Sequence, residues 1–292
     1  MIERLSSKDE IRAAVAAARR EGKRVGFVPT MGALHAGHLS LVSAACKRAD
    51  VVVTSIFVNP TQFGPSEDFA AYPRSLESDI ALLSGDGVEI VFTPSAAEMY
   101  GELPVVTVDP GPLAARWEGA VRPGHFSGVA TVVTKLLSVV RPDIAFFGEK
   151  DYQQLQIVKR LVADLDVGCQ IVGCATVRDE DGLALSSRNV HLSSEQRVAA
   201  LALPAALEAA ELAVAWGERS AAAIEAGMRD TVARLAGDAL LLDYAAVVDA
   251  SSLEPVVELR GCVRAIIAGR IGPTRLIDNC ALDASECEAA HA

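Results

Sequence analysis

At 292 residues, the chain is long enough for two domains, or for one large domain with a sizeable core. Apolar residues make up 51% of it, which excludes an intrinsically disordered chain, and the net charge of −11 argues against a general nucleic-acid binder. No apolar stretch approaches the roughly 20 residues that a membrane span needs, and residues 1–9 lack a signal-peptide pattern, so we expect a cytoplasmic protein without membrane contact.

The six cysteines give no sign of a metal centre or of a disulfide framework. None of them forms a Cys-x-x-Cys pair, and none is spaced from a histidine as in a zinc finger. We therefore expect reduced thiols at Cys46, Cys169, Cys174, Cys262, Cys280 and Cys287.

The first half of the chain alternates strands and helices. Ser7 and Glu10 have the spacing of a capping box, and the Ala-rich residues that follow predict a first helix to Arg20, with Gly22 as its stop. Strands are then predicted at 24–28, 51–57, 88–92, 105–108, 144–147 and 170–173, and helices at 38–49, 76–84, 127–140 and 152–165. This alternation predicts an α/β fold with a doubly wound, Rossmann-like parallel sheet, which binds ligands at the carboxyl ends of its strands.

The second half of the chain has a different texture. A helix-rich stretch over 193–236, with a break at Gly217, precedes short strands predicted at 242–248, 256–259, 262–267 and 275–278. This pattern predicts a smaller α+β C-terminal lid domain. We expect a Rossmann-like domain over 1–176 and the second domain over 177–292.

The segment 29–38, Pro-Thr-Met-Gly-Ala-Leu-His-Ala-Gly-His, connects the strand at 24–28 to a helix. Backbone N–H groups and the positive end of the helix dipole favour an anion there. His35 and His38 would stabilise negative charge that builds on phosphate oxygens. A lone histidine is usually a core residue, but two of the chain's five at one glycine-bearing turn indicate a nucleoside triphosphate site.

Two further loops follow strands of the predicted sheet. Asn59 and Gln62 come after the strand at 51–57, and their amides suit a small hydroxylated acid, although Asn59-Pro60 also makes an ordinary turn. Lys150 and Asp151 come after the strand at 144–147 and suit a phosphate and a ribose hydroxyl. The alternative for this second loop is a charged first turn of a helix.

Three other segments carry weaker signals. Two serines and Arg188 near residues 181–189 suit a phosphate clamp, and the same residues also suit a mobile surface turn. Asp79 is a candidate for the magnesium that ATP carries, or a plain helix stabiliser. Arg122 and His125 suit a carboxylate, or form a loop and helix entry.

The His-x-Gly-His sequence resembles the signature of a nucleotidyltransferase superfamily. The segments 29–38, 57–64, 72–74, 147–154 and 181–189 together resemble, in order and spacing, the pantoate–β-alanine ligases of that superfamily. The resemblance covers nearly the whole chain. It implies that (R)-pantoate and ATP give a pantoyl adenylate, which β-alanine converts to pantothenate and AMP, with Mg²⁺ as cofactor. It also implies a homodimer.

The resemblance implies a role for each matching residue. His38, the proton donor, and His35 are the implied catalytic residues, Gln62 and Gln154 would bind pantoate, Gln62 would also contact β-alanine, and Asp79 would approach the magnesium ion. The implied ATP-binding residues are Met31, Gly32, Ala33, Leu34, His35, Ala36, Gly37, His38, Gly148, Glu149, Lys150, Asp151, Val177, Leu185, Ser186, Ser187 and Arg188. This chain departs from the family at Ser78, where some members have a second acid, and Arg188 stands where the superfamily signature has lysine.

Two other functions remain open on the sequence alone. One is a nucleotidyltransferase that joins a nucleotide to another small acid or phosphate compound, and the other is a nucleotide sensor without catalysis. The amides of Asn59, Gln62 and Gln154 favour a hydroxy acid over a phosphate compound, and the presence of both histidines and of Lys150 favours catalysis.

Overall fold

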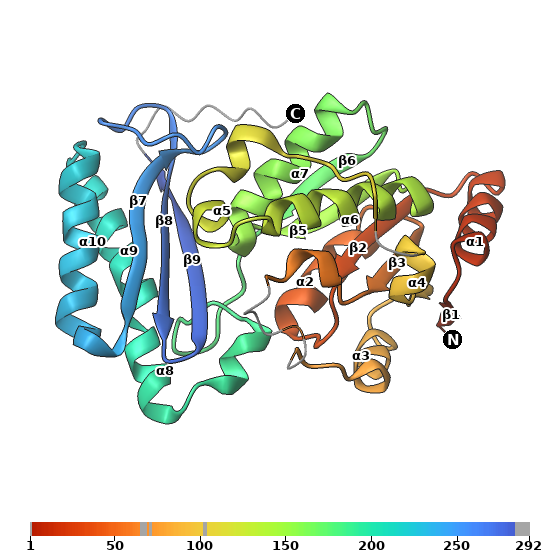
Figure 1. Cartoon of the computed structure of the whole chain (residues 1–292), viewed down its shortest axis with the longest axis horizontal. Helices are drawn as coiled ribbons and strands as arrows, with labels where there is room; N and C mark the ends of the chain where they lie inside the picture. The colour runs from red at the N-terminus through yellow and green to blue at the C-terminus, as the bar shows by residue number, and fades with distance from the viewer. Residues whose placement is uncertain (1, 65–68, 70–71, 102–103, 284–292) are drawn as a thin grey trace. The chain divides into compact units, whose positions relative to one another are not determined.

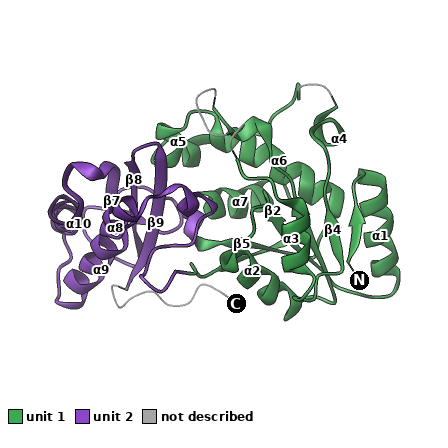
Figure 2. Cartoon of the chain, turned by 90° about the horizontal axis from the view of Figure 1, so that it is seen from below, with its two compact units in different colours: residues 1–149, 153–177 green, residues 150–152, 178–292 purple. Residues whose placement is uncertain are grey.

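The structure (Figure 1) is a computed structural model that describes residues 2–64, 69, 72–101 and 104–283. The chain divides into two compact units, drawn in two colours in Figure 2. The first comprises 1–149 and 153–177, and the second comprises 150–152 and 178–292. The second unit therefore consists of two separate stretches of the chain, one of three residues and one that begins at Arg178.

The first unit is built on a sheet of six parallel strands in the order β1-β4-β3-β2-β5-β6. The strands are β1 (Glu3–Leu5), β2 (Val25–Thr30), β3 (Val51–Ile56), β4 (Ile90–Phe92), β5 (Ile144–Gly148) and β6 (Gln170–Cys174). Its helices are α1 (Lys8–Arg20), α2 (Ala36–Cys46), α3 (Leu76–Leu83), α4 (Ala96–Tyr100), α5 (Glu118–Val121), α6 (His125–Val140) and α7 (Tyr152–Asp164), with 3₁₀ turns η1 (Pro60–Gln62), η2 (Gly111–Ala114) and η3 (Glu149–Asp151). The predicted Rossmann-like parallel sheet is confirmed.

Helices cover both faces of this sheet (Figure 1), which explains why its central strands are apolar on both sides. On one face, Val28 of β2 and Phe146 of β5 pack with Val42 of α2 and Leu83 of α3. The opposite side chain of β2, Phe27, is also fully buried, and α1 and α6 contact that strand and each other.

The strand predictions fail where the sequence pattern is short. Residues 105–108 form no strand, and Val105 and Val106 are 97% and 84% exposed. A β-branched run predicts a strand only where a neighbouring strand can pair with it. Conversely, β1 was missed because it has only three residues, of which Leu5 alone is buried.

The second unit is a three-stranded antiparallel sheet covered by helices (Figure 1). Its elements are η4 (Ser187–His191), α8 (Ser194–Ala200), α9 (Ala202–Ala215), α10 (Ala221–Ala236), η5 (Gly237–Ala239), β7 (Leu241–Asp249), β8 (Cys262–Ile271) and β9 (Thr274–Asp283). Leu203, Met228 and Ile267 lie in its separate core. The predicted strand at 256–259 is wrong, because this segment forms only one isolated bridge, through Glu258.

Within the part of the chain that the structure describes, one helical stretch, Ser194–Ala215, is long and apolar enough to cross a membrane by length and composition, contrary to the sequence expectation. Leu203, Leu207 and Val214 on this stretch are buried in the core of the second unit. Core helices meet the same length and composition test, so the stretch is weak support for a membrane span.

Five of the six cysteines lie among the described residues, and four of these follow the sequence expectation; Cys287 lies outside the described residues. Cys46, Cys169, Cys174 and Cys280 are free thiols, as predicted. Cys262 is disulfide-bonded, so the expectation of a reduced thiol is wrong for this residue. Spacing rules detect cysteines that are close in sequence, and Cys262 has no such neighbour.

Candidate active site

The loops that follow β2, β3 and β5 carry most of the candidate residues of the first unit. These three strands are parallel and adjacent in the order β3-β2-β5, so their carboxyl ends share one edge of the sheet. Residues 31–35 follow β2, 57–59 follow β3, and Glu149 follows β5. The sheet therefore gathers three predicted binding loops at one edge.

The loop after β2 has an unusual backbone. Gly32 and Ala33 both have positive φ angles, +83° and +50°. A Cβ atom on Gly32 would lie 2.9 Å from Oδ2 of Asp79, so the position needs glycine for its backbone conformation and for space. Ala33 has no such freedom, and a non-glycine residue adopts this conformation only where its surroundings impose it.

Asp79 imposes it. This carboxylate on α3 is 2% exposed, its Oδ2 accepts a hydrogen bond from the Ala33 amide at 3.0 Å, and its Oδ1 accepts one from the Leu34 amide at 2.8 Å. Both carboxylate oxygens thus hold the loop that leads into the two histidines. The expected contact of Asp79 with magnesium stays a prediction. Among the described residues, no cluster of three or more His, Cys, Asp or Glu side chains could hold a metal ion.

The two histidines lie at the start of α2. His35 is the N-cap, and its Nδ1 accepts a hydrogen bond from the Gly37 amide at 3.1 Å. Nδ1 of His38 accepts one from the His35 amide at 3.4 Å, and the two ring centroids are 4.1 Å apart. Because a neutral imidazole that accepts at Nδ1 carries its proton on Nε2, these contacts favour Nε2–H donors on both rings.

Gln62, on η1 after β3, is tied to the same loop. Its Oε1 accepts a hydrogen bond from Nδ2 of Asn59 at 3.0 Å, which fixes the orientation of the Gln62 amide. Its Nε2 then lies 3.0 Å from Sδ of Met31, and its backbone oxygen is 2.8 Å from Nδ1 of His125. The structure therefore brings Gln62 and Met31, two predicted binding residues, into contact.

Asn59 is the buried centre of this second loop. It is 1% exposed, and its Oδ1 accepts hydrogen bonds from the hydroxyls of Tyr100 at 2.6 Å and Thr61 at 2.9 Å. Burial raises the pKa of the Tyr100 phenol, so the hydroxyl keeps the proton that it donates. Asn59, itself fixed by these two hydroxyls, thus orients the side-chain amide of Gln62.

The end of β5 presents the charged candidates. Nζ of Lys150 lies 3.8 Å from Oδ1 of Asp151, and the Lys150 side chain is 20% exposed. Gln154 is partly buried on the first turn of α7. Gly148, Glu149 and Gln154 belong to the first unit, whereas Lys150 and Asp151 group with the second.

The predicted clamp belongs to the second unit. Ser186 is the N-cap of η4, and its Oγ accepts a hydrogen bond from the Arg188 amide at 3.3 Å. Nδ2 of Asn189 donates to the carbonyl of Ala184 at 3.1 Å, which closes the segment 185–188 into a loop. Val177 is the last residue of the first unit.

Two residues of this unit were missed by sequence reasoning. Asp278 and Asn279, adjacent on β9, are 3% and 4% exposed, and they contact Arg178 and Lys150 respectively. The strand predicted at 275–278 ended at Asp278 and left Asn279 outside it. Their position between apolar neighbours, Ile277 and Cys280, was the available signal.

Comparisons with known proteins show the family to which the chain belongs. The family model described as pantoate-beta-alanine ligase matches residues 3–281. The pantothenate synthetase of Rhizorhabdus wittichii is 54% identical over 276 residues, which cover 94% of this chain and 96% of that protein. That of Mycolicibacterium smegmatis is 52% identical over 279 residues, covering 95% and 87%.

Solved structures give the same result. The pantothenate synthetase of Thermus thermophilus aligns with a TM-score of 0.90 and 48% identity, over 96% of this chain and 99% of that one. The pantoate-beta-alanine ligase of Francisella tularensis, complexed with beta-gamma ATP and beta-alanine, aligns with a TM-score of 0.79 and 34% identity, over 96% and 97%.

Proposed function

Because this chain belongs to the pantoate–β-alanine ligase family, we propose how its residues carry out that family's reaction. The enzyme joins pantoate to β-alanine at the expense of ATP, forming a carbon–nitrogen bond. A carboxylate is a poor acyl donor, since its oxygen is a poor leaving group. ATP removes this obstacle by converting that oxygen into part of an acyl phosphate anhydride.

In the first step, a carboxylate oxygen of (R)-pantoate attacks the α-phosphorus of ATP. The new O–P bond forms as the bond to pyrophosphate breaks, giving pantoyl adenylate, and negative charge builds on the phosphate oxygens. His35 and His38 donate Nε2–H hydrogen bonds to these oxygens, and the N-terminus of α2 adds its dipole. The observation that carries this proposal is the pair of imidazoles whose Nδ1 atoms accept backbone N–H groups.

The acid lies beside the histidine loop. Asn59 orients the amide of Gln62 so that its NH₂ group, the donor, faces Met31. A donor suits the hydroxyl and carboxylate oxygens of pantoate, and Gln154 supplies a second amide. Gln62 also contacts β-alanine, whose amine attacks the acyl carbon in the second step while AMP leaves.

Several segments of the chain contact the nucleotide. Met31 to His38 line the phosphates, Gly148 to Asp151 and Val177 contact the adenosine portion, and Leu185 to Arg188 clamp the phosphates. Magnesium enters with ATP as part of the substrate, held by phosphate oxygens and water. We assign Asp79 to the loop, because each of its carboxylate oxygens accepts a backbone hydrogen bond from it.

We also propose that the enzyme is a homodimer in the cytoplasm. The family resemblance supports the dimer.

The reaction is tested with purified protein, MgATP, (R)-pantoate and β-alanine. AMP and pantothenate should form in equal amounts, and omission of either pantoate or β-alanine should abolish steady-state AMP release. Pyrophosphate should still form in a single turnover without β-alanine. Transfer of the nucleotide to another small acid or phosphate compound, with no AMP from pantoate, would favour the nucleotidyltransferase alternative.

His38→Ala should lower the rate of that single turnover by about 10²–10³, the scale for loss of one transition-state donor. His35→Asn is the informative partner variant, because asparagine also caps a helix but offers no donor at the Nε2 position. A His38→Ala rate within twofold of the wild-type rate would remove His38 from the mechanism.

A further inference from the structure

We propose that Asp278 and Asn279 of β9 are positioning residues for ATP. They hold two separate ATP-binding segments, Lys150 with Asp151 and the clamp at 185–188, against one strand. The inference rests on the ATP-binding roles proposed above for those segments. Neither Asp278 nor Asn279 needs to touch the nucleotide.

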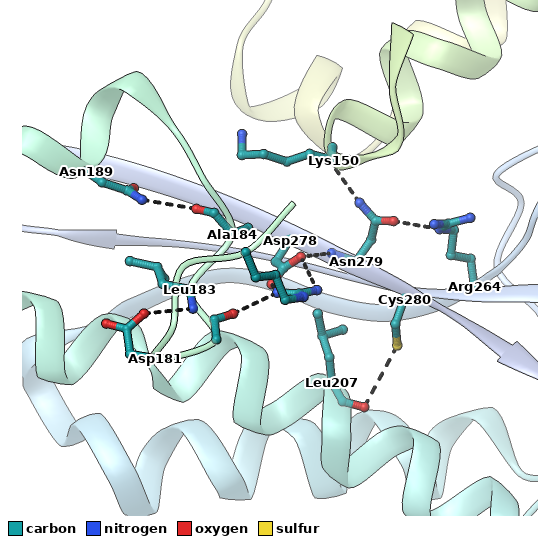
Figure 3. Close-up of polar contacts among 12 residues, drawn as sticks. Lys150, Asp181, Leu183, Ala184, Asn189, Leu207, Arg264, Asp278, Asn279 and Cys280 are labelled. Carbon is teal, nitrogen blue, oxygen red and sulfur yellow. Dashed lines mark hydrogen bonds and ion pairs between the residues drawn. The ribbon is translucent and has the colours of Figure 1, made fainter. Parts of the chain in front are cut away.

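Asn279 holds the Lys150 segment through the backbone. Its Nδ2 donates a hydrogen bond to the carbonyl of Lys150 at 2.9 Å, and its Oδ1 accepts one from Nε of Arg264 at 2.6 Å (Figure 3). Both ends of the buried amide are therefore used, so its orientation is fixed. A buried amide with a satisfied donor and acceptor resists displacement, because a shift would leave a polar atom unpaired.

Arg264 and Tyr152 hold the other end of the same three-residue segment. The guanidinium of Arg264 lies over the Tyr152 ring, 3.8 Å from its centroid, and the Tyr152 hydroxyl donates to the carbonyl of Ala250 at 2.8 Å. Residues 150–152 are thus fixed at both ends by the sheet of the second unit. This explains why they group with that unit.

Asp278 holds the segment that leads into the clamp. Its carboxylate accepts two hydrogen bonds from the guanidinium of Arg178, at 2.6 and 3.0 Å, and the pair raises the pKa of Arg178. Arg178 also donates to the carbonyl of Gly182 at 3.1 Å and pairs through its backbone with Ala184. The clamp begins at the next residue, Leu185.

The other end of the clamp returns to the same hairpin. Asn189 donates to the carbonyl of Ala184 (Figure 3). The segment 185–188 is therefore closed on a hairpin that Arg178 fixes to β9. The pair of Asp278 and Arg178 is costly to bury, since only 2% of the Asp278 side chain is exposed. Such a pair is a poor source of stability and a good means of fixing a geometry, which fits a positioning role.

The test is the KM for each substrate in four variants of the full chain. Asn279→Ala removes both contacts of the amide, and Asn279→Asp keeps the acceptor for Arg264 but loses the donor to Lys150. Asp278→Asn weakens the ion pair with Arg178. The matched control is Asp243→Asn, because Asp243 also forms an ion pair with a residue of β9, Arg275 at 2.6 Å, but its ion-pair partners, Arg270 and Arg275, lie in neither ATP-binding segment.

Both Asn279 variants and Asp278→Asn should raise the KM for ATP about tenfold, the effect of one lost hydrogen bond of about 1.4 kcal/mol. The KM for β-alanine should stay within twofold of the wild-type value. Asp243→Asn should leave the KM for ATP unchanged even if it lowers the melting temperature as much as the others do. Equal increases for all substrates, or an unchanged KM for ATP, would overturn the inference.

Two further variants keep the outcomes distinct. If Asp278→Asn does not fold, Arg178→Lys takes its place, because lysine keeps the positive charge but loses one of the two hydrogen bonds to Asp278. This variant should also raise the KM for ATP. A wild-type KM would contradict the role of Asp278. Lys150→Ala tests the underlying assignment. If it leaves the KM for ATP unchanged, the proposed role of Lys150 fails; if it raises the KM and Asn279→Asp does not, the positioning role of Asn279 alone fails.

Discussion

A single buried carboxylate, that of Asp79, determines the shape of the loop that presents the two histidines. Asparagine at this position could accept only one of the two backbone hydrogen bonds, and its NH₂ group would face the amide of Ala33 or of Leu34. The loop would then shift by a fraction of an ångström. We expect Asp79→Asn to lower kcat/KM by about 10–100-fold, the scale for misplaced catalytic groups.

The magnesium dependence of this variant separates a loop anchor from a metal ligand. An anchor leaves the magnesium concentration for half-maximal rate unchanged, whereas loss of a ligand would raise it and excess magnesium would restore the rate. Ser78→Ala, at the preceding position of α3, is the matched control and should behave as wild type. Restoration of the Asp79→Asn rate by magnesium would return Asp79 to the metal site.

At the scale of elements, Arg197 of α8 fixes the hairpin that precedes the clamp. Its guanidinium lies 2.6 Å from Oδ2 of Asp179 and 2.7 Å from Oδ2 of Asp181. The hydrogen bond from Arg197 holds the pKa of Asp181 below its ordinary value of 3.8. A carboxyl whose pKa is lowered by folding contributes stability above its unfolded pKa, and this stability is lost as the pH falls through the folded pKa.

Asp181→Asn should therefore lower the urea midpoint of unfolding at pH 7, and this effect should shrink as the pH falls below the ordinary pKa of 3.8. The change in the free energy of unfolding should stay below about 1 kcal/mol, because both side chains are about one-third exposed and water screens the pair. A difference between variant and wild type that persists undiminished at pH 3 would show that packing, and not charge, is responsible.

The sequence predicted the elements that local chemistry determines. The capping box of Ser7 and Glu10 is present at the start of α1, and the apolar runs of β2, β3 and β5 form the centre of the parallel sheet. The failures at 105–108 and 256–259 have one cause. Strand propensity depends on a partner that local sequence does not reveal.

The candidate site was predictable to a similar extent. Residues in loops after strands, such as His38, Gln62 and Lys150, carry local patterns that indicate ligand binding. The residues that hold them do not, because Asn279 acts on Lys150 across 129 positions of sequence and Asp79 acts on Leu34 across 45. Contacts of this kind depend on the fold, so only the structure could identify them.

For the whole molecule, the net charge determines how the stability of the proposed homodimer depends on salt. Each chain carries −11, so two copies repel each other at long range. Light scattering at 0.15 M salt should give a molecular mass of about twice the 30.6 kDa of one chain. In 0.01 M salt the repulsion between the chains extends over about 30 Å instead of about 8 Å, so the dimer should dissociate already at a higher protein concentration than in 0.15 M salt. A monomer at every salt and protein concentration would contradict the dimer.

Residues 150–152 belong to the second unit although they lie within the sequence of the first, and this limits which segments can be exchanged between this enzyme and its relatives. A chimera joined at residue 177 would take the N-terminal part from one parent and leave Tyr152 facing the other parent's counterpart of Arg264. The backbone carbonyl at position 150 survives any such exchange, whereas the contact between the Tyr152 ring and the guanidinium depends on the side chains of both parents. A functional graft of the C-terminal part therefore has to bring this three-residue segment with it, so the unit that can be exchanged is discontinuous in the gene.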